Sequence, residues 1–197
     1  GYHAFRIPAL VRLPEPDGNL LLFAEGRRLS SSDHGWNDIV AKRSSDNGQT
    51  WGPMEKVYGE STDNKSVCIG NPAPIGRKDG TVVLVACRDN SDVLVIHSNP
   101  LATSWGNATY ITPQVKAPAW TWVATGPPQG LELPSGRLLV AADHIGKGGV
   151  WGSHAMFSDD GGASWQISSS SGAAGRPGKN WSGPLTNGNE CQAAVAP

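Results

Sequence analysis

Four charged side chains, two of them at the ends of apolar segments, could carry chemistry in this sequence. Arg6 opens one apolar segment and Arg27 closes the next, and a guanidinium group can bind a carboxylate through two hydrogen bonds. Asp33 follows in a polar stretch, and Glu190 lies much later in the chain. Either carboxyl group could transfer a proton to or from a bound molecule. Such chemistry requires a fold that brings the start of the chain close to Glu190.

A hairpin pattern that occurs three times indicates how such a fold is built. Apolar segments flank a tight turn at Asp17-Gly18, Asp79-Gly80 and Ser135-Gly136, about 60 residues apart. Asp-Gly between two apolar segments is a strong signal for a β-hairpin. The pattern therefore predicts an all-β chain made of structural repeats.

A second motif follows each hairpin. Residues 44–51 and 158–165 share the pattern Ser-x-Asp-x-Gly-x-[Ser/Thr]-Trp, here called an Asp-box, and residues 98–105 keep its Ser and its Ser-Trp end. The Asp can accept hydrogen bonds from N–H groups of the turn, the Gly permits a positive φ, and the Trp is expected to pack between repeats. Units of about four strands with such turns are typical of propeller blades. We predict an all-β β-propeller, of which three blades and the first strand of a fourth are present.

The blade pattern also indicates where a site should lie. In a propeller the inner strands run alongside the central axis, so polar residues at equivalent strand ends converge on one face. Inner strands are predicted to begin near Arg6, Asn71, Gln129 and Glu190, and second strands to end near Arg27, Arg88 and Asp143. The stretch 168–188 is rich in Ser, Gly, Asn and Pro and is interpreted as a long loop.

Composition narrows the class of protein. The 197 residues suffice for one domain, and residues 1–197 are interpreted as a single partial propeller domain, truncated at both ends. A net charge of −1 gives no reason to expect nucleic acid as a partner. No apolar run approaches the roughly 20 residues that a membrane span needs. The three cysteines and the histidines lack the spacing of a metal or redox motif, so neither a metal site nor a cofactor is expected.

The motifs at the start of the chain resemble those of a known family. Phe5-Arg6-Ile7-Pro8, then Phe23-Ala24-Glu25-Gly26-Arg27, the loop with Asp33 and two Asp-boxes resemble the sialidase (neuraminidase) family in order and approximate spacing. Residues 70–74, 125–130 and 189–192 also look like family segments. The resemblance implies a six-bladed propeller and an exo-α-sialidase, a retaining glycoside hydrolase that releases terminal sialic acid. Sialylated glycans would then be its partners.

The same resemblance implies roles for individual residues. Arg6 matches the first of three arginines that bind the carboxylate of the sugar. Arg27 matches an arginine near the acid and the sugar ring and is likewise expected to bind the substrate. Asp33 matches the general acid/base of the reaction. Glu190 matches the carboxylate that activates a tyrosine nucleophile, which avoids the repulsion between a carboxylate nucleophile and the sugar's own carboxylate.

Two further positions complete the expected site. Asn71 and Gln129 are predicted to contact the substrate, although Gln129 stands where many relatives carry His. The tyrosine nucleophile and the two other carboxylate-binding arginines are expected after Glu190, outside these 197 residues. The 197 residues on their own are therefore expected to be inactive.

Several residues have a second interpretation. Asp33 follows three serines, which is also good turn chemistry, and Asp38 is a competing acid. Asp143 and His144 could face the pocket or form a structural hydrogen-bonded pair.

Trp120 and Trp122 could line the pocket or pack between blades. The alternative function is a non-catalytic Asp-box propeller that binds glycans or proteins.

Overall fold

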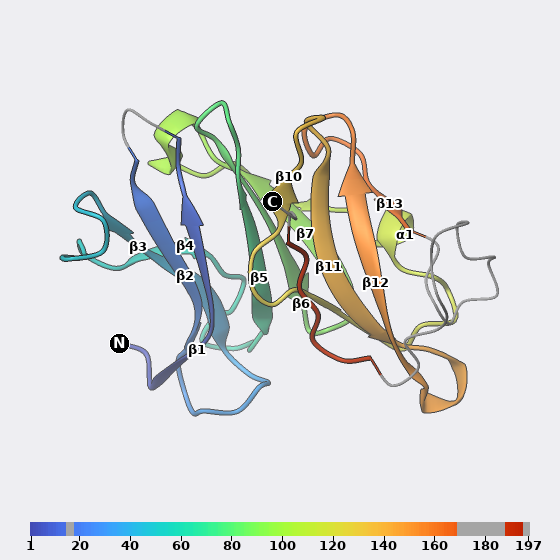
Figure 1. Ribbon diagram of the computed structural model, residues 1–197. Helices are drawn as coiled ribbons and strands as arrows, with labels where there is room; N and C mark the ends of the chain where they lie inside the picture. The colour runs from blue at the N-terminus through green and yellow to red at the C-terminus, as the bar shows by residue number, and fades with distance from the viewer. Residues whose placement is uncertain (15–17, 169–187, 195–197) are drawn as a thin grey trace.

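A computed structural model of the protein describes residues 1–14, 18–168 and 188–194, and contains three antiparallel sheets in chain order (Figure 1). The first sheet comprises β1 (Ala4–Arg12), β2 (Leu20–Arg27), β3 (Asn37–Ser44) and β4 (Glu55–Tyr58). The second comprises β5 (Ile69–Gly76), β6 (Val82–Arg88), β7 (Asp92–His97) and β8 (Thr109–Tyr110). The third comprises β9 (Trp122–Thr125), β10 (Leu131–Glu132), β11 (Leu138–Ile145), β12 (Trp151–Ser158) and β13 (Gln166–Ile167).

Strand order follows chain order in the first two sheets, as the repeat pattern predicts, while in the third sheet β9 and β10 both pair with β11. Hairpins at Gly80 and Gly136 join β5 to β6 and β10 to β11, and both glycines have a positive φ. The hairpin between β1 and β2 includes Asp17, which lies outside the described residues, as does most of the stretch 168–188. The helical elements are short: η1 (Pro100–Ala102), α1 (Thr112–Val115) and η2 (Lys147–Gly149). Within the described ranges, no helix is long and apolar enough to cross a membrane.

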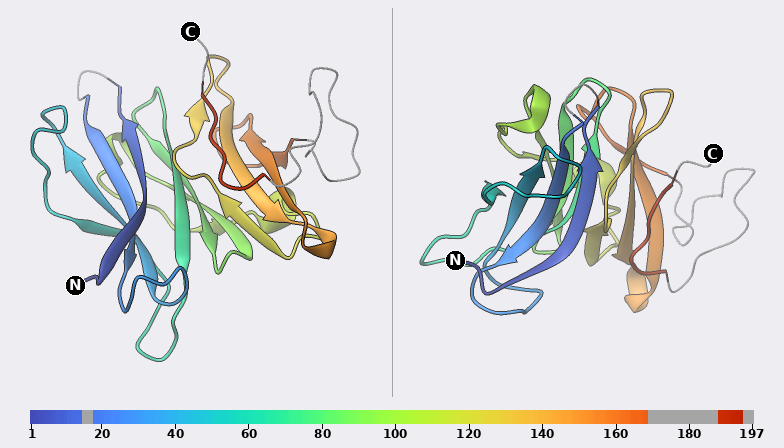
Figure 2. Two further views of the ribbon diagram at one scale, coloured as in Figure 1. Left: turned by 60° about the horizontal axis from the view of Figure 1, so that its bottom comes forward. Right: turned by 60° about the vertical axis from the view of Figure 1, so that its left-hand side comes forward.

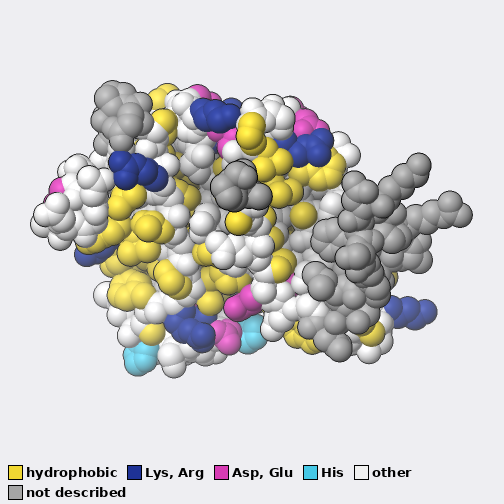
Figure 3. Space-filling view, viewed as in Figure 1, with side chains coloured by type: hydrophobic (Ala, Val, Ile, Leu, Met, Phe, Trp, Pro, Cys, Tyr) yellow, Lys and Arg dark blue, Asp and Glu magenta, His cyan; other side chains and the backbone are white. Residues whose placement is uncertain are grey.

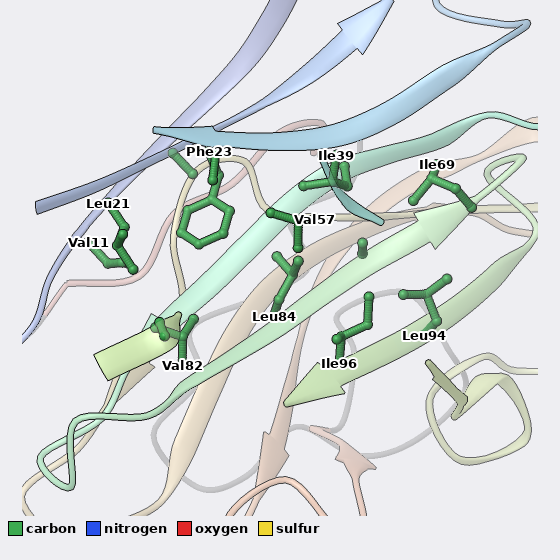
Figure 4. Packing of buried hydrophobic residues seen from close by; sticks show 14 of the residues in the cluster. Val11, Leu21, Phe23, Ile39, Val57, Ile69, Val82, Leu84, Leu94 and Ile96 are labelled. Carbon is green, nitrogen blue, oxygen red and sulfur yellow. The ribbon is translucent and has the colours of Figure 1, made fainter. Parts of the chain in front are cut away.

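The second sheet is buried on both faces because it packs between the other two, which lie beside it in the views of Figure 2. Along β6, side chains alternate between the two faces. Leu84 packs with Phe23 and Ile39 of the first sheet (Figure 4), while Val83 and Val85 pack against the third sheet. This double burial explains the unbroken apolar run of β6. Fully burying a side chain such as Phe23 stabilises the fold by about 1.5–3 kcal/mol.

The Asp-boxes close the outer strands with the hydrogen bonds that their sequence predicts. In the first, Oδ1 of Asp46 accepts a bond from the N–H of Thr50 at 2.8 Å, and Gly48 has a φ of 86°. Asp160 accepts the equivalent bond from Ser164 at 2.9 Å. In the degenerate copy, Oδ1 of Asn99 accepts bonds from two successive N–H groups, so an amide replaces the carboxylate.

Trp105 and Trp165 of these turns pack between the sheets, as expected. Trp105 meets Phe23 edge to face with ring centroids 5.7 Å apart, and Trp165 is buried in the cluster between the second and third sheets.

Each innermost strand bends at an equivalent point. The register of β1 shifts between Arg6 and Ala9, that of β5 shifts between Gly70 and Ala73, and the third inner strand is interrupted between β9 and β10. A residue with a positive φ lies at each bend, namely Ile7 (55°), Asn71 (52°) and Gly126 (65°). A positive φ is a genuine outlier for a β-branched residue such as Ile7, and strained residues of this kind cluster at functional sites.

Residues 188–194 run along the third sheet (Figures 1 and 2) but form no strand there. The sequence predicts the first strand of a fourth blade at this point. Within the described part of the chain, no neighbouring strand forms a ladder with this segment. Hydrogen bonds to the third sheet hold it instead, from Cys191 Sγ to the carbonyl of Ala142 and from Ser153 Oγ to the carbonyl of Asn189, both at 3.2 Å.

Candidate active site

One cavity of about 310 Å³ lies at the end of the sheets where β1 begins and where β2 and β6 end. Its lining comes from all three sheets and from the segment 188–194. The predicted residues that line it are Arg6, Arg27, Asp33, Asn71 and Glu190. This end of the sheets is at the bottom of Figure 3, where basic, acidic and histidine side chains gather. The fold therefore brings the start of the chain close to Glu190.

Along one face of strand β2, side chains of the apolar core are followed by side chains that line the cavity. Leu21 and Phe23 belong to the apolar cluster between the first and second sheets. Glu25 and Arg27 continue the same face, because side chains two residues apart in a strand point the same way. Both are buried, with exposed fractions of 3% and 1%, and both line the cavity. The period of two that places Phe23 in the core therefore places Glu25 beside Arg27 in the site.

Glu25 links the first and second sheets, a role that the sequence analysis did not assign. Its Oε2 accepts bonds from Nε and Nη2 of Arg27 at 3.0 and 2.7 Å. Its Oε1 accepts the N–H of Asn71 at 2.8 Å. Burial raises the pKa of Glu25, and the bonds from Asn71 and Arg27 oppose that rise. A buried ion pair of this kind leaves an expensive uncompensated charge when one partner is removed.

Asp33 lies at the mouth of the cavity, held by two arginines. Its Oδ1 is 2.7 Å from Nη1 of Arg27 and accepts a bond from Nη1 of Arg6 at 3.2 Å. Its carbonyl accepts bonds from Asn37 and from the thiol of Cys68, which fix the loop. The side chain is 68% exposed and bonds to arginines, so it does not act as a turn cap. Arg6 is also half exposed, at 52%.

The competing acid, Asp38, has a different environment. It is buried, and its Oδ2 accepts bonds from the hydroxyl of Tyr2 at 2.9 Å and from Nε1 of Trp36 at 3.3 Å. It does not line the cavity. These contacts make Asp38 a structural residue of the first sheet, and of these two aspartates only Asp33 lines the cavity.

Asn71 and Gln129 occupy different places. The main chain of Asn71 joins the three sheets, because its N–H binds Glu25 and its carbonyl accepts the hydroxyl of Thr125 at 2.7 Å. Gln129 does not line the cavity, and Pro127 lies there in its place. The hairpin repeat places the third inner strand at Gln129, whereas that strand begins earlier, at Trp122. Gly126 is the residue equivalent to Asn71, because both lie at the bend with a positive φ.

The two tryptophans have separate roles. Trp122 lines the cavity together with Trp151, and their rings meet edge to face with centroids 5.1 Å apart. Trp120 instead stacks on His144 at 3.7 Å. An indole wall therefore lies on the side of the third sheet, with the charged groups of Arg6 and Asp33 on the side of the first.

Asp143 and His144 do not form a pair, because adjacent residues of β11 point to opposite faces. The Nδ1 atoms of His144 and His154 lie 3.0 Å apart, so one ring donates to the other. Burial lowers the pKa of His144 to about 4 and that of His154 to about 3. Asp143 is completely buried and lies under the segment that carries Glu190.

Thiols and tyrosines complete the inventory of possible nucleophiles. Cys68 and Cys87 line the cavity, and burial raises the pKa of each to about 12, so both thiols are neutral. Tyr2 binds Asp38, while Tyr58 and Tyr110 both donate to Glu60. None of the three tyrosines of the sequence, all within the described ranges, lines the cavity.

Comparison with known proteins identifies the class to which this fold and cavity belong. Residues 18–197 match the model of the BNR repeat-like domain family. The chain belongs to that family.

The proteins most useful for comparison are sialidases. The chain is 29% identical over 184 residues to an exo-alpha-sialidase of Aspergillus fumigatus, covering 75% of this chain and 44% of the relative. It is 29% identical over 195 residues to human sialidase-4, covering 82% and 39%. Among solved structures, Hadza microbial sialidase Hz136 is 28% identical with a TM-score of 0.79, covering 86% and 38%. A Trypanosoma rangeli sialidase in complex with the inhibitor DANA shares the fold, with a TM-score of 0.70 at 20% identity, covering 86% and 32%.

These matches confirm the resemblance to sialidases and the prediction of a sialidase-type β-propeller, present here in part. The chain spans less than half the length of each of these relatives.

Proposed function

We propose that the protein is an exo-α-sialidase, a retaining glycoside hydrolase that releases terminal sialic acid from glycoproteins, glycolipids and oligosaccharides. One observation carries the proposal: Asp33 lies between Arg6 and Arg27 at the mouth of a cavity that Glu190 also lines. The relatives named as sialidases support it.

Arg6 is the residue best placed to bind the carboxylate of the sugar. It is half exposed, and its hydrogen bond to Asp33 uses one nitrogen of the guanidinium group, which leaves a planar donor facing the cavity. Arg27 differs because its bonds to Glu25, Ser31 and Asp33 engage all three of its nitrogens. We therefore assign Arg27 to positioning Asp33 rather than to binding substrate directly.

The chemistry assigned to Asp33 has two halves. Its carboxyl group donates a proton to the glycosidic oxygen as the bond from that oxygen to the anomeric carbon breaks and the nucleophile bonds to that carbon. In the second half, the carboxylate accepts a proton from the water whose oxygen replaces the nucleophile. Exposure of Asp33 at the cavity mouth suits both halves, because the leaving group and the water must reach it from solvent.

Glu190 is assigned to accept the proton of the nucleophile's hydroxyl group. The nucleophile itself is assigned to a tyrosine outside these 197 residues, because Tyr2, Tyr58 and Tyr110 are bound to other carboxylates away from the cavity. The 197 residues alone would then bind sialylated glycans without cleaving them. The absence of a cavity tyrosine from the sequence is also the observation that favours the alternative of a non-catalytic, glycan-binding propeller.

The test uses the complete protein, including any sequence that its gene encodes beyond residue 197. Proton NMR would follow its action on 3′-sialyllactose, and the α-anomer of free sialic acid is expected to appear before mutarotation. Initial release of the β-anomer would overturn the retaining mechanism. Saturation-transfer signals from bound 3′-sialyllactose without any release would favour the non-catalytic alternative.

A further inference from the structure

Asp143 carries a buried carboxyl group on the third sheet. It lies on β11 with none of its side chain exposed, and neither Oδ1 nor Oδ2 has a partner among the described residues. Most buried polar atoms in native proteins are hydrogen-bonded, so an exception requires an explanation. A buried carboxyl without a cation is far less costly in its neutral form than as an anion.

The segment that carries Glu190 is fixed directly over Asp143. Cys191 bonds to the carbonyl of Ala142, the residue before Asp143, and Ser153 bonds to the carbonyl of Asn189. Ser153 is the cross-strand partner of Asp143 on β12, so it shares a face with it. The residues before and after Glu190 are thus attached on either side of Asp143.

The groups that face Asp143 add negative charge and no positive charge among the described residues. Burial, and then the charge of Glu190, raise the pKa of Asp143 to about 7, and the N–H of Asp143 itself opposes that rise. The thiols of Cys191 and Cys87 are its other titratable neighbours, and burial raises the pKa of both. His144 and His154 point to the opposite face of the sheet. Asp143 is therefore neutral below about pH 7, and above that pH it is a buried anion close to the exposed side chain of Glu190.

We propose that Asp143 is a positioning residue for Glu190. As long as Asp143 is neutral, it allows the segment 189–191 to stay bound to the third sheet. Ionisation places a second negative charge below Glu190. Lifting of the segment relieves that charge, because water then reaches Asp143. Glu190 moves away from the cavity in the same step. The kinetic part of this proposal rests on the proposed sialidase function, while the movement of the segment does not.

The sign of the pH dependence follows from the raised pKa. A carboxyl with a folded-state value near 7 and an ordinary value near 4 binds its proton more tightly in the folded protein. Its contribution to stability is complete below pH 4 and is lost as the pH rises to 7. Asp143→Asn keeps a neutral side chain of the same shape and removes this dependence. His144 and His154 titrate in the opposite sense in both proteins. Their effect therefore cancels when the free energy of unfolding of the wild type is subtracted from that of the variant.

The experiment uses the complete protein and compares its wild type with Asp143→Asn and with Asp159→Asn, a matched control. Asp159 is an exposed carboxylate in the turn after β12, and it pairs with Arg137. With an aryl α-sialoside between pH 5 and 9, kcat/KM of the wild type and the control should fall relative to Asp143→Asn by up to about tenfold for each unit above pH 7. Profiles of the wild type and Asp143→Asn that run parallel would overturn the proposal.

Alkylation of Cys191 by iodoacetamide gives a readout that needs no activity. Peptide mass spectrometry would compare its rate in the wild type and in Asp143→Asn at pH 6 and pH 8. The rates should agree at pH 6, and the wild type should react several-fold faster at pH 8 because its segment has lifted. Equal rates at both values overturn the proposal, even for a protein that releases no sialic acid. If Asp143→Asn does not fold, Asp143→Ser replaces it in both assays.

Discussion

Nη1 of Arg27 lies 2.7 Å from Oδ1 of Asp33, while Nε and Nη2 of the same guanidinium group bind Oε2 of Glu25. An exposed acid is thus attached to a buried ion pair. The ion pair in turn joins the first sheet to the main chain of Asn71 in the second. Placement of the acid is therefore coupled to the packing of two blades.

This coupling predicts a large loss of stability when Arg27 is replaced. Arg27→Met leaves Glu25 buried without its cation, and we expect the free energy of unfolding to fall by about 3–5 kcal/mol. Urea denaturation measures the change. Adding Glu25→Gln should recover part of the loss, because a neutral amide can still accept the N–H of Asn71.

The matched control is Arg28→Met, because Arg28 lies over the ring of Trp36 at 4.3 Å and takes no part in the ion pair. Arg28→Met should lower the free energy of unfolding by about 1 kcal/mol or less. If the costs of Arg27→Met and Glu25→Gln simply add in the double variant, the two residues are not coupled as described.

The bend in the third inner strand predicts a second stability effect. Gly126 has a φ of 65°, and an added Cβ would meet the carbonyl oxygen of Pro128 at 3.0 Å. Gly126→Ala should therefore lower the free energy of unfolding by more than 1 kcal/mol. Gly136→Ala provides the control, since Gly136 also has a positive φ but has open space around it. Equal costs for the two variants would show that the close approach at the bend has no effect.

The indole wall predicts a change in substrate affinity. Trp122→Ala removes one face of the cavity while leaving Arg6 and Asp33 in place. We expect KM for a sialoside to rise on the order of tenfold with a smaller change in kcat, because stacking on the wall binds substrate and transition state alike. Trp120→Ala is the comparison, since that ring stacks on His144 away from the cavity. A fall in kcat with unchanged KM for Trp122→Ala would contradict this assignment.

Local patterns predicted most of the fold. The Asp-Gly turns and Asp-boxes identify the hairpins and the outer strands, because these turns depend on side chains and glycines within a few residues of one another. The third inner strand shows the limit of this approach. Trp122 to Thr125 lies before two consecutive prolines, and a hairpin signal centred on Ser135-Gly136 reaches only as far as β10. The hairpin signal therefore predicts Gln129 at the position that Gly126 occupies.

Some residues of the site can also be predicted from the sequence, while others cannot. Arg6, Asp33 and Glu190 belong to motifs that a single sequence can reveal, and all three line one cavity. Glu25 could have been found from its spacing of two residues from Arg27 on the same strand. Asp143 is indicated by its place at the end of a predicted strand, but its position under Glu190 is not. That position and the place of Trp151 depend on how the third sheet packs against segments distant in the chain.

Asp33 provides the most direct test of the account. A general acid matters most when the leaving group is a poor one, so its loss should depend on the substrate. In the complete protein, Asp33→Ala should lower kcat/KM on 3′-sialyllactose by a factor on the order of 10²–10⁴. The loss should be much smaller on an aryl α-sialoside, whose phenolate leaves without protonation. Asp79→Asn, an exposed residue at the opposite end of β5, serves as the control and should match the wild type. An equal loss on both substrates, or no loss on either, would contradict the assignment of Asp33 as the acid of a sialidase site.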